Sequence, residues 1–585
     1  MAATSPRTEA RWLLPEADSR QTADLTGALG ISPLAARVLV HRGLADPAAA
    51  RRFLRPEFDH LHDPLTLRDM PAAIDRLARA IRDRERILIY GDYDVDGTTS
   101  VVLLTKAIEL AGGAASYHVP HRLKDGYGMR SEVIEAAAAQ GVKLIVSVDT
   151  GIRAAEVVQR ARDLAIDVIV TDHHLPDSDL PPALAVLNPN RRDCAYAEKN
   201  LCGAGVAFKL IQALLPAMGW PAEKIRRVSE SFLKIAAIAT VADVVPLTGE
   251  NRVIVALGLR GLSDVRNPGL RALLDVAGFG NGAAPPSARQ VAFQIAPRMN
   301  AAGRMDTARA VVELFLTNDA ARARDLARQL HDQNTERQQV EAETRDMCDQ
   351  IEVAEHECAL VYYAENWHRG VLGIVASRLV ERLHRPVFVL SRNPEDGLAQ
   401  GSGRSIPAFH LLRALESMPD LFVRFGGHEH AAGVTLDTAR VAEFRERFNA
   451  YAAALLSPED YLRRVDIDAV VELREISERA IGEIFGLAPF GHGNPAPLFA
   501  ALNVEVAGHT VWKEKHLKVM VRQPGRTLSL KSWNFAERAR DLAPGARIDI
   551  AFNLEEDAYS AARGYPGWAA TLRDFRPASG ALPPE

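Results

Sequence analysis

Residues 87–97 read Ile87-Leu88-Ile89-Tyr90-Gly91-Asp92-Tyr93-Asp94-Val95-Asp96-Gly97, and this stretch decides the fold class. A short apolar run delivers three carboxylates, at alternate positions, to a glycine. Continuous apolar runs of strand length are typical of parallel strands that are buried on both faces, and an open α/β sheet gathers its functional groups where such strands end. The stretch therefore predicts a parallel sheet with part of a metal site at its carboxyl edge.

Three later segments have the same construction, an apolar run that ends in metal-ligand residue types. They are residues 144–149, which end in Asp149, residues 168–174, which end in Asp172-His173-His174, and residues 235–243, which end in Asp243. The first two are expected to be further parallel strands. Helical patterns separate the strands at residues 100–111, 131–140 and 153–164, and this alternation is the βαβ signature of a parallel sheet. Four such endings can converge on one pocket.

Oxygen and imidazole ligands favour Mg²⁺ or Mn²⁺, and a pair of ions about 3.5 to 4 Å apart needs a bridging carboxylate. The candidate ligands are Asp94, Asp96, Asp149, His173 and Asp243. Because alternate residues of an ideal strand point the same way, Asp94 and Asp96 could share a face, although Gly97 implies that the chain is already turning there. An aspartate at the end of a strand is more often a cap or turn residue, so the hypothesis rests on the joint occurrence of these groups.

Three neighbouring residues have supporting roles in this hypothesis. Asp92 is either a third ligand of its cluster or a group that supports the ligands. In the Asp172-His173-His174 triplet, one histidine can bind metal while the other contacts the substrate, and the aspartate can orient a ring. We therefore expect Asp92 and Asp172 to lie just behind the ligands.

The composition describes a large globular chain. It has 585 residues, 47% hydrophobic and 25% charged, and a net charge of -5 from 70 Lys+Arg against 75 Asp+Glu. A polyanionic partner would have to be bound by a local basic groove, because the overall field is nearly neutral. The 4 cysteines show no CxxC spacing, and residues 1–21 lack the apolar stretch of a signal peptide. No apolar run approaches the roughly 18 to 20 residues that cross a bilayer, so we expect a cytoplasmic protein without membrane attachment.

Changes of pattern divide the chain. Residues 1–75 are rich in proline and are predicted to be a lead-in that packs on a catalytic domain of residues 76–305. A mostly uninterrupted helical pattern over residues 306–355, polar in its later half, predicts a connector between domains. A second, smaller α/β pattern covers residues 356–455. Short strands broken by glycine and proline over residues 464–578 predict a small β-barrel.

The motifs of residues 91–97 and 172–174 resemble those of the DHH phosphoesterase superfamily, and in particular of its RecJ family of single-strand-specific 5′-to-3′ DNA exonucleases. The resemblance is nearly chain-long, with supporting segments at residues 187–190, 201–206, 242–247 and 298–305. It implies an α/β fold in which a parallel-sheet DHH domain and a smaller α/β DHHA1 domain are joined by a long helix, followed by an oligonucleotide-binding (OB) barrel. It also implies a role in DNA recombination and repair.

The resemblance further implies the parts of the active site. Two divalent ions, Mn²⁺ or Mg²⁺, would be held by Asp94, Asp96, Asp149, His173 and Asp243, with Asp149 bridging them. His174 and Arg304 would stabilise the phosphate and the leaving group during attack by water. Position 90 holds a metal-binding histidine in much of the superfamily and is Tyr90 here, so we expect one ion to be held weakly.

Two parts of the α/β region are expected to bind the DNA. Glycine-rich stretches at residues 401–405 and 425–433 allow a backbone to approach an anion while side chains donate to it. Alone they are more often tight turns, but they resemble the DHHA1 domain, which implies that Ser402, Arg404 and His428 contact the DNA backbone. Residues 120–128 offer a cation, Arg122, and a ring, Tyr127, and the resemblance points to Arg122 as a contact for the 5′ end.

The barrel sequence interleaves cations with aromatic residues, namely Trp512, Lys513, Lys515, Lys518, Arg522, Arg526, Lys531 and Trp533. This combination on short strands is typical of OB folds that bind single strands by stacking and charge neutralisation. We predict contacts from Lys513, Lys515 and Lys518. A solvated barrel face with tryptophans in the core is the plain alternative.

Three functions remain open at this point. The first is a 5′-to-3′ exonuclease that hydrolyses single-stranded DNA to 5′-mononucleotides. The second is a DHH phosphoesterase for dinucleotide-sized substrates, which would not need the basic barrel. The third is a catalytically silent DNA-binding scaffold, although none of the expected acidic ligands is missing. We expect a monomer, and the resemblance offers a single-stranded-DNA-binding protein and a RecQ-type helicase as candidate protein partners.

Overall fold

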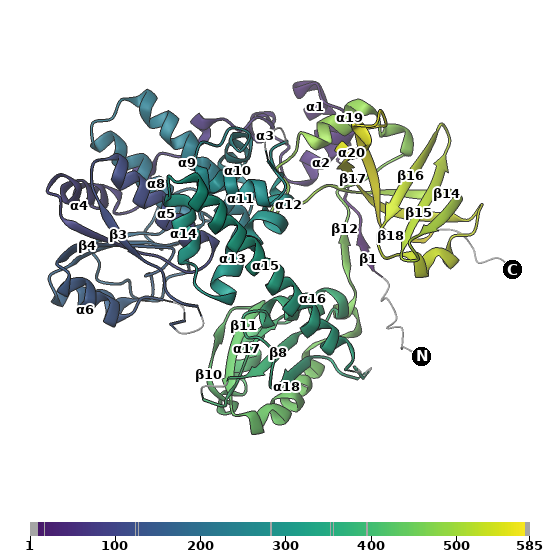
Figure 1. The fold of residues 1–585 in the computed structure, drawn as a ribbon. Helices are drawn as coiled ribbons and strands as arrows, with labels where there is room; N and C mark the ends of the chain where they lie inside the picture. Colours follow the sequence, from purple (N-terminus) through teal and green to yellow (C-terminus); the bar gives the residue numbers. More distant parts are fainter. Residues whose placement is uncertain are drawn as a thin grey trace.

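The computed structural model describes residues 10–578 except 17, 123–124, 127, 281–283, 352, 355 and 394–395. Tyr127, a predicted substrate contact, lies outside the described residues. Figure 1 shows an α/β domain, a second α/β domain and a β-barrel, with the long helix α15 (Ala320–Asp349) running from the first domain to the second. This arrangement agrees with the predicted fold class.

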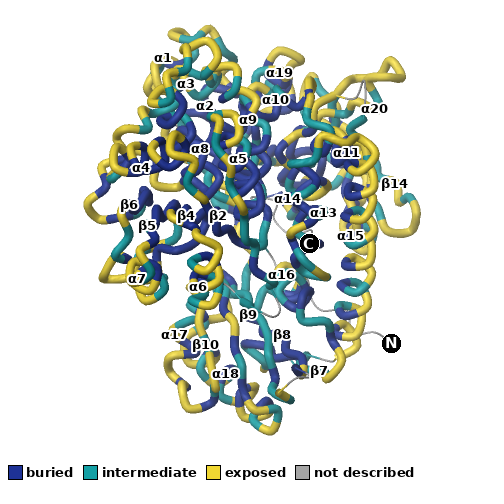
Figure 2. The backbone as a smooth tube through the Cα atoms, turned by 60° about the vertical axis from the view of Figure 1, so that its left-hand side comes forward, coloured by how far each residue is buried: buried dark blue, intermediate teal, exposed yellow. Residues whose placement is uncertain are grey.

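The sheet of the first domain is parallel throughout, as predicted, in the order β3-β2-β4-β5-β6. Its strands are β2 (Arg86–Tyr90), β3 (Ala115–His118), β4 (Val142–Val148), β5 (Asp167–Thr171) and β6 (Ala185–Leu187). Ile87 and Ile89 of β2 belong to one hydrophobic core, whereas Leu88 and Tyr90 belong to the core on the opposite face. Because both faces are covered, residues 87–90 of β2 and 144–146 of β4 are apolar, and Figure 2 colours β2 and β4 as buried.

Helices cover both faces of this sheet. The larger core contains residues of α4 (Met70–Arg82), α5 (Val95–Leu110), α8 (Gly203–Ala217), α9 (Ala222–Ala242), α10 (Gly249–Gly261) and α11 (Pro268–Val276). The opposite face packs against α6 (Ser131–Ala139) and α7 (Ala155–Asp163). Beyond α11 the chain forms α12 (Ala288–Gln290), the π-helix η3 (Val291–Ile295), α13 (Ala296–Met305) and α14 (Arg309–Leu316).

The prediction that Asp94 and Asp96 share a strand face is wrong. Strand β2 ends at Tyr90, and Asp94 is the N-cap of α5, accepting a hydrogen bond from the Gly97 N–H at 2.9 Å. Asp96 lies in the first turn of that helix. An N-cap carboxylate satisfies a free helix N–H group, so Asp94, which suggests a metal site, also caps the helix. Asp243 is likewise the C-cap of α9 and does not follow a strand.

The predicted connector is two helices and not one. The chain breaks between α14 and α15, where Asp319 caps α15 by accepting from the Ala321 N–H at 2.7 Å. In its first half α15 buries Leu326 and Leu330 in the core of the first domain, whereas Cys348 near its end lies in a core of the second. The change from apolar to polar along the helix therefore marks the step between domains, as predicted.

The second domain has a five-stranded sheet in the order β10-β11-β9-β8-β7, in which β7 and β8 are parallel and the other pairs are antiparallel. The strands are β7 (Leu360–Ala364), β8 (Val387–Arg392), β9 (Ala399–Arg404), β10 (Phe422–Gly427) and β11 (Ala431–Leu436). Helix α16 (Leu372–Leu383) packs into one core, and α17 (Leu411–Glu416) and α18 (Val441–Leu455) pack into the other.

The C-terminal region forms the predicted barrel. Its strands are β13 (Ala469–Val470), β14 (Leu498–Trp512), β15 (His516–Gln523), β16 (Arg526–Ser532), β17 (Arg547–Glu556) and β18 (Trp568–Pro577). Pairing between β14 and β17 closes the sheet β14-β15-β16-β18-β17 on itself. Helix α19 (Glu478–Phe485) packs into the barrel core, and the short helix α20 (Ala558–Ala561) connects β17 to β18.

The prediction that residues 1–75 pack on the catalytic domain is wrong for their first part. Helices α1 (Ser19–Leu29), α2 (Pro33–His41) and α3 (Pro47–Leu54) share the core of the barrel, and β1 (Arg11–Leu13) pairs in parallel with β12 (Arg464–Asp466). From Phe58 onward the lead-in packs against the hydrophobic core of the first domain. Apolar helix faces show that a segment docks, but they do not show on which of two cores it docks.

The barrel is anchored beside a predicted metal ligand. The Leu247 N–H, four residues after Asp243, donates to the His492 carbonyl at 2.7 Å. The buried Arg252 donates to the carbonyls of Phe53 at 2.7 Å and Ala488 at 2.8 Å. One arginine thus joins the lead-in, the first domain and the segment before the barrel.

No single helix in the described part of the chain is long and apolar enough to cross a membrane. Helices α1 and α2 reach that length and composition only as a pair, across a bend of 119°.

Candidate metal centre and nucleic-acid interface

The structure brings all the predicted ligands together at the carboxyl edge of the parallel sheet. His173 Nε2 lies 3.1 Å from Asp149 Oδ1 and 3.7 Å from both Asp96 Oδ2 and Asp243 Oδ2. Asp92 and Asp94 form an overlapping group with Asp149. Asp149 therefore belongs to both halves of the cluster, which is the position that a bridging ligand requires. Metal binding by these residues stays a prediction.

Backbone groups fix the carboxylates from several elements. Asp96 accepts from the N–H groups of Gly203 at 2.5 Å and Ala204 at 2.8 Å, at the positive end of α8. Asp149 follows β4 at φ 60°, a conformation that costs free energy in a residue other than glycine. A Cβ on Gly203 would lie 2.6 Å from the Cβ of Asp149, so only glycine fits there. The role of the α8 N-terminus was missed from the sequence, although residues 201–206 carried part of the resemblance.

The Asp172-His173-His174 triplet divides its work as expected. Asp172 is fully buried and accepts from His174 Nδ1 at 2.7 Å and from the Ile152 N–H at 2.9 Å. Asp172 belongs to none of the groups of described residues that could hold a metal ion, and its role is to orient His174. The carbonyls of His173 and His174 accept from Asn190 at 2.6 Å and Asn188 at 2.8 Å. These asparagines hold the backbone of the triplet, a role that the sequence alone did not reveal.

The electrostatics of the cluster fit a divalent cation. Burial, followed by repulsion from neighbouring carboxylates, raises the pKa of Asp92 to about 8 and of Asp243 to about 9. The same causes raise the pKa of Asp94 and Asp149. Buried oxygens of Asp92, Asp149 and Asp243 have no hydrogen-bond partner among the described residues. Such groups are costly unless a cation satisfies them, and this donor set suits Mg²⁺ or Mn²⁺.

The two histidines differ in protonation tendency. Burial lowers the pKa of His173, which favours the neutral ring that binds metal. Burial acts to lower the pKa of His174, but the hydrogen bond to Asp172 and the charges of the nearby carboxylates together outweigh it, and the net shift is upward. His174 is therefore suited to donate to an anionic phosphate, which agrees with the role predicted for it.

A group of arginines faces this cluster from both α/β domains. Arg304 of α13 donates to the Gly370 carbonyl of the second domain at 3.0 Å. Burial lowers its pKa to about 9, and the charges of Arg122, Arg337 and Arg404 act in the same direction, so these guanidinium groups lie close to one another. Arg122 lies over the Tyr93 ring at 4.9 Å. Crowded cations of this kind are stabilised by an anion, and a phosphate between the two domains would satisfy them.

The predicted contacts of the second domain lie on or beside β9. Ser402 and Arg404 are two residues apart on this strand, and Arg404 is buried enough that desolvation lowers the pKa of its guanidinium. His428 is exposed, and its N–H donates to the Ala431 carbonyl at 2.8 Å. Ala431 is the register partner of Arg404, so the turn that carries His428 adjoins the arginine.

Trp512 and Trp533 do not belong to the hydrophobic core of the barrel, so the alternative of core tryptophans does not hold for them. Trp512, His516 and Trp533 form a cluster with ring centroids 4.8 to 5.7 Å apart, and Trp533 is 54% exposed. Lys513, Lys515 and Lys518 are exposed around the β14–β15 turn. Lys518 stands opposite Lys531 in the β15–β16 register, and Lys531 is paired with Asp557 at 3.3 Å.

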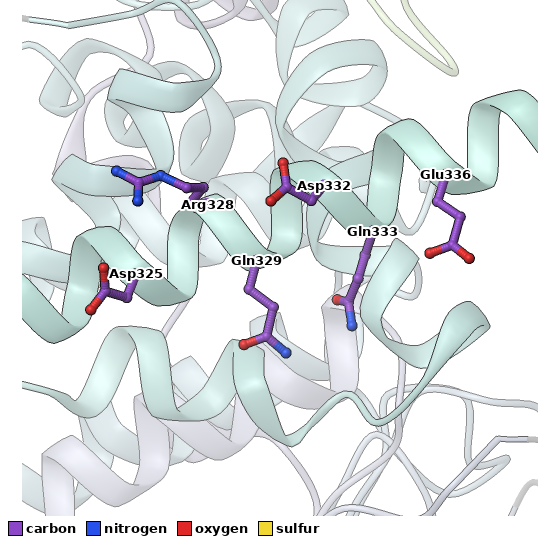
Figure 3. A pocket seen from close by; sticks show the side chains of 6 residues that line it. All are labelled: Asp325, Arg328, Gln329, Asp332, Gln333 and Glu336. Carbon is purple, nitrogen blue, oxygen red and sulfur yellow. The ribbon is translucent and has the colours of Figure 1, made fainter.

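A shallow groove along α15 has the opposite character. It is lined by Asp325, Arg328, Gln329, Asp332, Gln333 and Glu336 (Figure 3). Three carboxylates against one guanidinium make this face unsuited to a polyanion.

Three family models match the chain. Residues 86–240 match the DHH family, N-terminal domain, residues 356–454 match the DHHA1 domain, and residues 467–564 match the RecJ OB domain. The chain is 37% identical to the single-stranded-DNA-specific exonuclease RecJ of Bacillus subtilis over 546 residues, which cover 92% of this chain and 68% of that protein. The chain belongs to the RecJ family. It is also 37% identical to the RecJ exonuclease of Escherichia coli, over 86% of this chain and 89% of that protein.

Solved RecJ structures share the architecture. RecJ of Thermus thermophilus in complex with Mn²⁺ superposes with a TM-score of 0.82 at 31% identity, covering 99% of this chain and 81% of that one. The complex of the same protein with Mg²⁺ gives 0.77 at 30% identity, covering 98% and 79%. The predicted family resemblance and fold class are confirmed.

Proposed function

We propose that this protein is a metal-dependent exonuclease that hydrolyses single-stranded DNA from the 5′ end to 5′-mononucleotides, in DNA recombination and repair. The observation that carries the proposal is the cluster of buried carboxylates with unsatisfied oxygens, faced by arginines from two domains, in a chain of the RecJ family. RecJ relatives are named as single-stranded-DNA-specific exonucleases, and solved relatives hold Mn²⁺ or Mg²⁺.

Asp94, Asp96, Asp149, His173 and Asp243 would hold two ions, with Asp149 shared between them. Divalent ions bound there would supply Lewis acidity, which activates the attacking water and neutralises charge at the phosphorus. Asp172 holds His174 so that its ring donates to the phosphate, and Arg304 stabilises the charge that develops on the phosphoryl oxygens. No serine or cysteine nucleophile is required.

The end preference would arise at Arg122. Its guanidinium lies on the Tyr93 ring, next to the carboxylates of residues 92–96, which suits a terminal phosphate held one nucleotide from the scissile bond. The barrel would capture the downstream strand by stacking on Trp512 and Trp533 and by its lysines.

The test is digestion of a single-stranded oligonucleotide labelled at either end, with Mn²⁺, with Mg²⁺ and with EDTA, beside a blunt duplex. We expect release of labelled mononucleotide from the 5′ label, progressive shortening of the strand labelled at its 3′ end, and an intact duplex. Cleavage confined to dinucleotides would favour the small-substrate phosphoesterase. Tight binding without metal-dependent cleavage would favour the silent scaffold.

We further propose that the protein acts in the cytoplasm as a monomer. Its cysteines Cys194, Cys202, Cys348 and Cys358 are all free, which fits a reducing compartment. A single-stranded-DNA-binding protein and a RecQ-type helicase remain the candidate partners that the family resemblance implies.

A further inference from the structure

Strand β9 carries a row of polar side chains that extends beyond Ser402 and Arg404. Side chains alternate along a strand, so Gln400, Ser402 and Arg404 share one face. A Cβ built on Gly373, in the first turn of α16, would lie 3.1 Å from Arg404 Nη2 and 3.5 Å from Ser402 Oγ. The row therefore runs past the N-terminal end of α16, where helix N–H groups also favour anions.

Arg369 continues this row at its Gln400 end. Its Nη1 donates to Gln400 Oε1 at 2.8 Å, and the residue is only partly buried. Arg378 and Arg392 of the same domain pair with Glu381 and Glu365, whereas Arg369 forms no ion pair with any residue that the structure describes. The neutral amide of Gln400 orients the guanidinium without neutralising its charge.

The position of Arg369 relates it to the active centre. The next residue, Gly370, accepts the hydrogen bond from Arg304 that joins the two α/β domains. The guanidinium of Arg369 is thus held one residue from this junction, at the end of a row whose other end, Arg404, adjoins Arg304 and Arg122. Donors two residues apart on a strand are about 6.6 Å apart, so the row follows a length of chain and not a single phosphate.

We propose that Arg369, oriented by Gln400, binds a backbone phosphate of the single strand and forms a phosphate subsite beyond Ser402 and Arg404. This inference rests on the proposed function and deepens it. A planar guanidinium fixed by one hydrogen bond keeps its remaining donors for a phosphate and loses little conformational entropy on binding. If the hydrogen bond only ties Arg369 to β9, substitution of Arg369 should leave the salt dependence of DNA binding unchanged.

The test is the salt dependence of DNA binding by the full chain. Binding of a fluorescent single-stranded oligonucleotide is measured with Mn²⁺ in an Asp149→Asn background, so that the strand is not cut, between about 50 and about 200 mM salt. We expect Arg369→Gln to weaken binding roughly three- to tenfold at the lowest salt and to reduce the slope of log affinity against log salt by about 0.7. Arg392→Gln, at the exposed end of β8, is the matched control and should change neither quantity.

Two further measurements separate the possible outcomes. In the protein with intact metal ligands, Arg369→Gln should raise KM and leave kcat unchanged, and Gln400→Leu should raise KM less. An unchanged salt slope in Arg369→Gln would overturn the subsite, even if affinity falls. Failure of the unsubstituted protein to bind or cut single-stranded DNA would instead overturn the proposed function, so the two failures are distinguishable.

Discussion

The carboxylate cluster of the first domain and the aromatic cluster of the barrel place their functional groups in opposite ways. Asp96 and Asp149 are almost fully buried; Asp96 accepts from two backbone N–H groups at the start of α8, and Asp149 directly follows β4. Trp533 is 54% exposed and lies beside the turn between β14 and β15. Groups that must hold ions at fixed distances are built into the ends of rigid elements, whereas capture of a strand of any sequence needs only exposed rings and mobile lysines.

The largest expected effect concerns the centre of the buried cluster. Asp149→Asn should lower the rate of cleavage by about a thousandfold or more, because one charge shared by both halves of the site is lost. Asparagine tolerates the positive φ of residue 149 better than alanine does, so it separates charge from backbone strain. Asp149→Ala should be equally inactive and should also remain folded.

The same substitution should also change the thermal stability of the metal-free protein. Burial, followed by repulsion from neighbouring carboxylates, makes an ionised Asp149 unfavourable in the metal-free cluster, so Asp149→Asn should melt at a higher temperature than the unsubstituted protein in EDTA. Circular dichroism and thermal melts measure this difference. Substantial cleavage by the variant, or a lower melting temperature in EDTA, would contradict the assignment of Asp149 to the centre of the site.

A smaller effect is expected at Asp172, which supports His174 and is not itself a candidate ligand. Asp172→Asn should lower activity by about ten- to a hundredfold, because the ring of His174 loses its charged hydrogen-bond partner. The pKa of His174 should fall, and NMR titration of the ring would report it. Asp163→Asn, at the exposed end of α7, is the control. An unchanged His174 titration would show that Asp172 does not set the ring's protonation.

The pH dependence of the metal-free protein tests the burial of the cluster. The pKa values of Asp92 and Asp243 in the folded state are about 8 and about 9, against roughly 3.9 in an unfolded chain. Between these limits the folded state holds protons that the unfolded state has released, so stability should fall as pH rises. Melting in EDTA should drop by several degrees from about pH 5 to about pH 8. Asp243→Asn should make the melting temperature depend less steeply on pH. A melting temperature that rises between these pH values would contradict the raised pKa values of the cluster.

The sequence predicted the parts of the molecule that depend on local pattern. Runs such as residues 87–90 and 144–148 identify buried parallel strands because burial on both faces leaves no polar position. The alternating carboxylates after the first strand were misleading. An aspartate at this place can bind a cation, but it can also cap the next helix, as Asp94 does. Contacts between segments that lie far apart in the sequence could not be predicted. Neither the docking of α1–α3 on the barrel nor the bond between Arg369 and Gln400 has a local signal, because each depends on how separate elements meet.

The smallest effect is expected at the exposed aromatic cluster. Trp533→Ala should weaken binding of single-stranded DNA about fivefold and raise KM, with kcat unchanged, because one stacking surface among several is lost and the metal centre is untouched. Tyr559→Ala removes a ring that is 69% exposed elsewhere on the barrel and should have no effect. The difference between the two variants measures whether the barrel binds DNA at this hairpin or over its whole surface. Equal loss from both would remove the hairpin's special role, and a fall in kcat for Trp533→Ala would show that the barrel acts on the metal centre and does more than capture the strand.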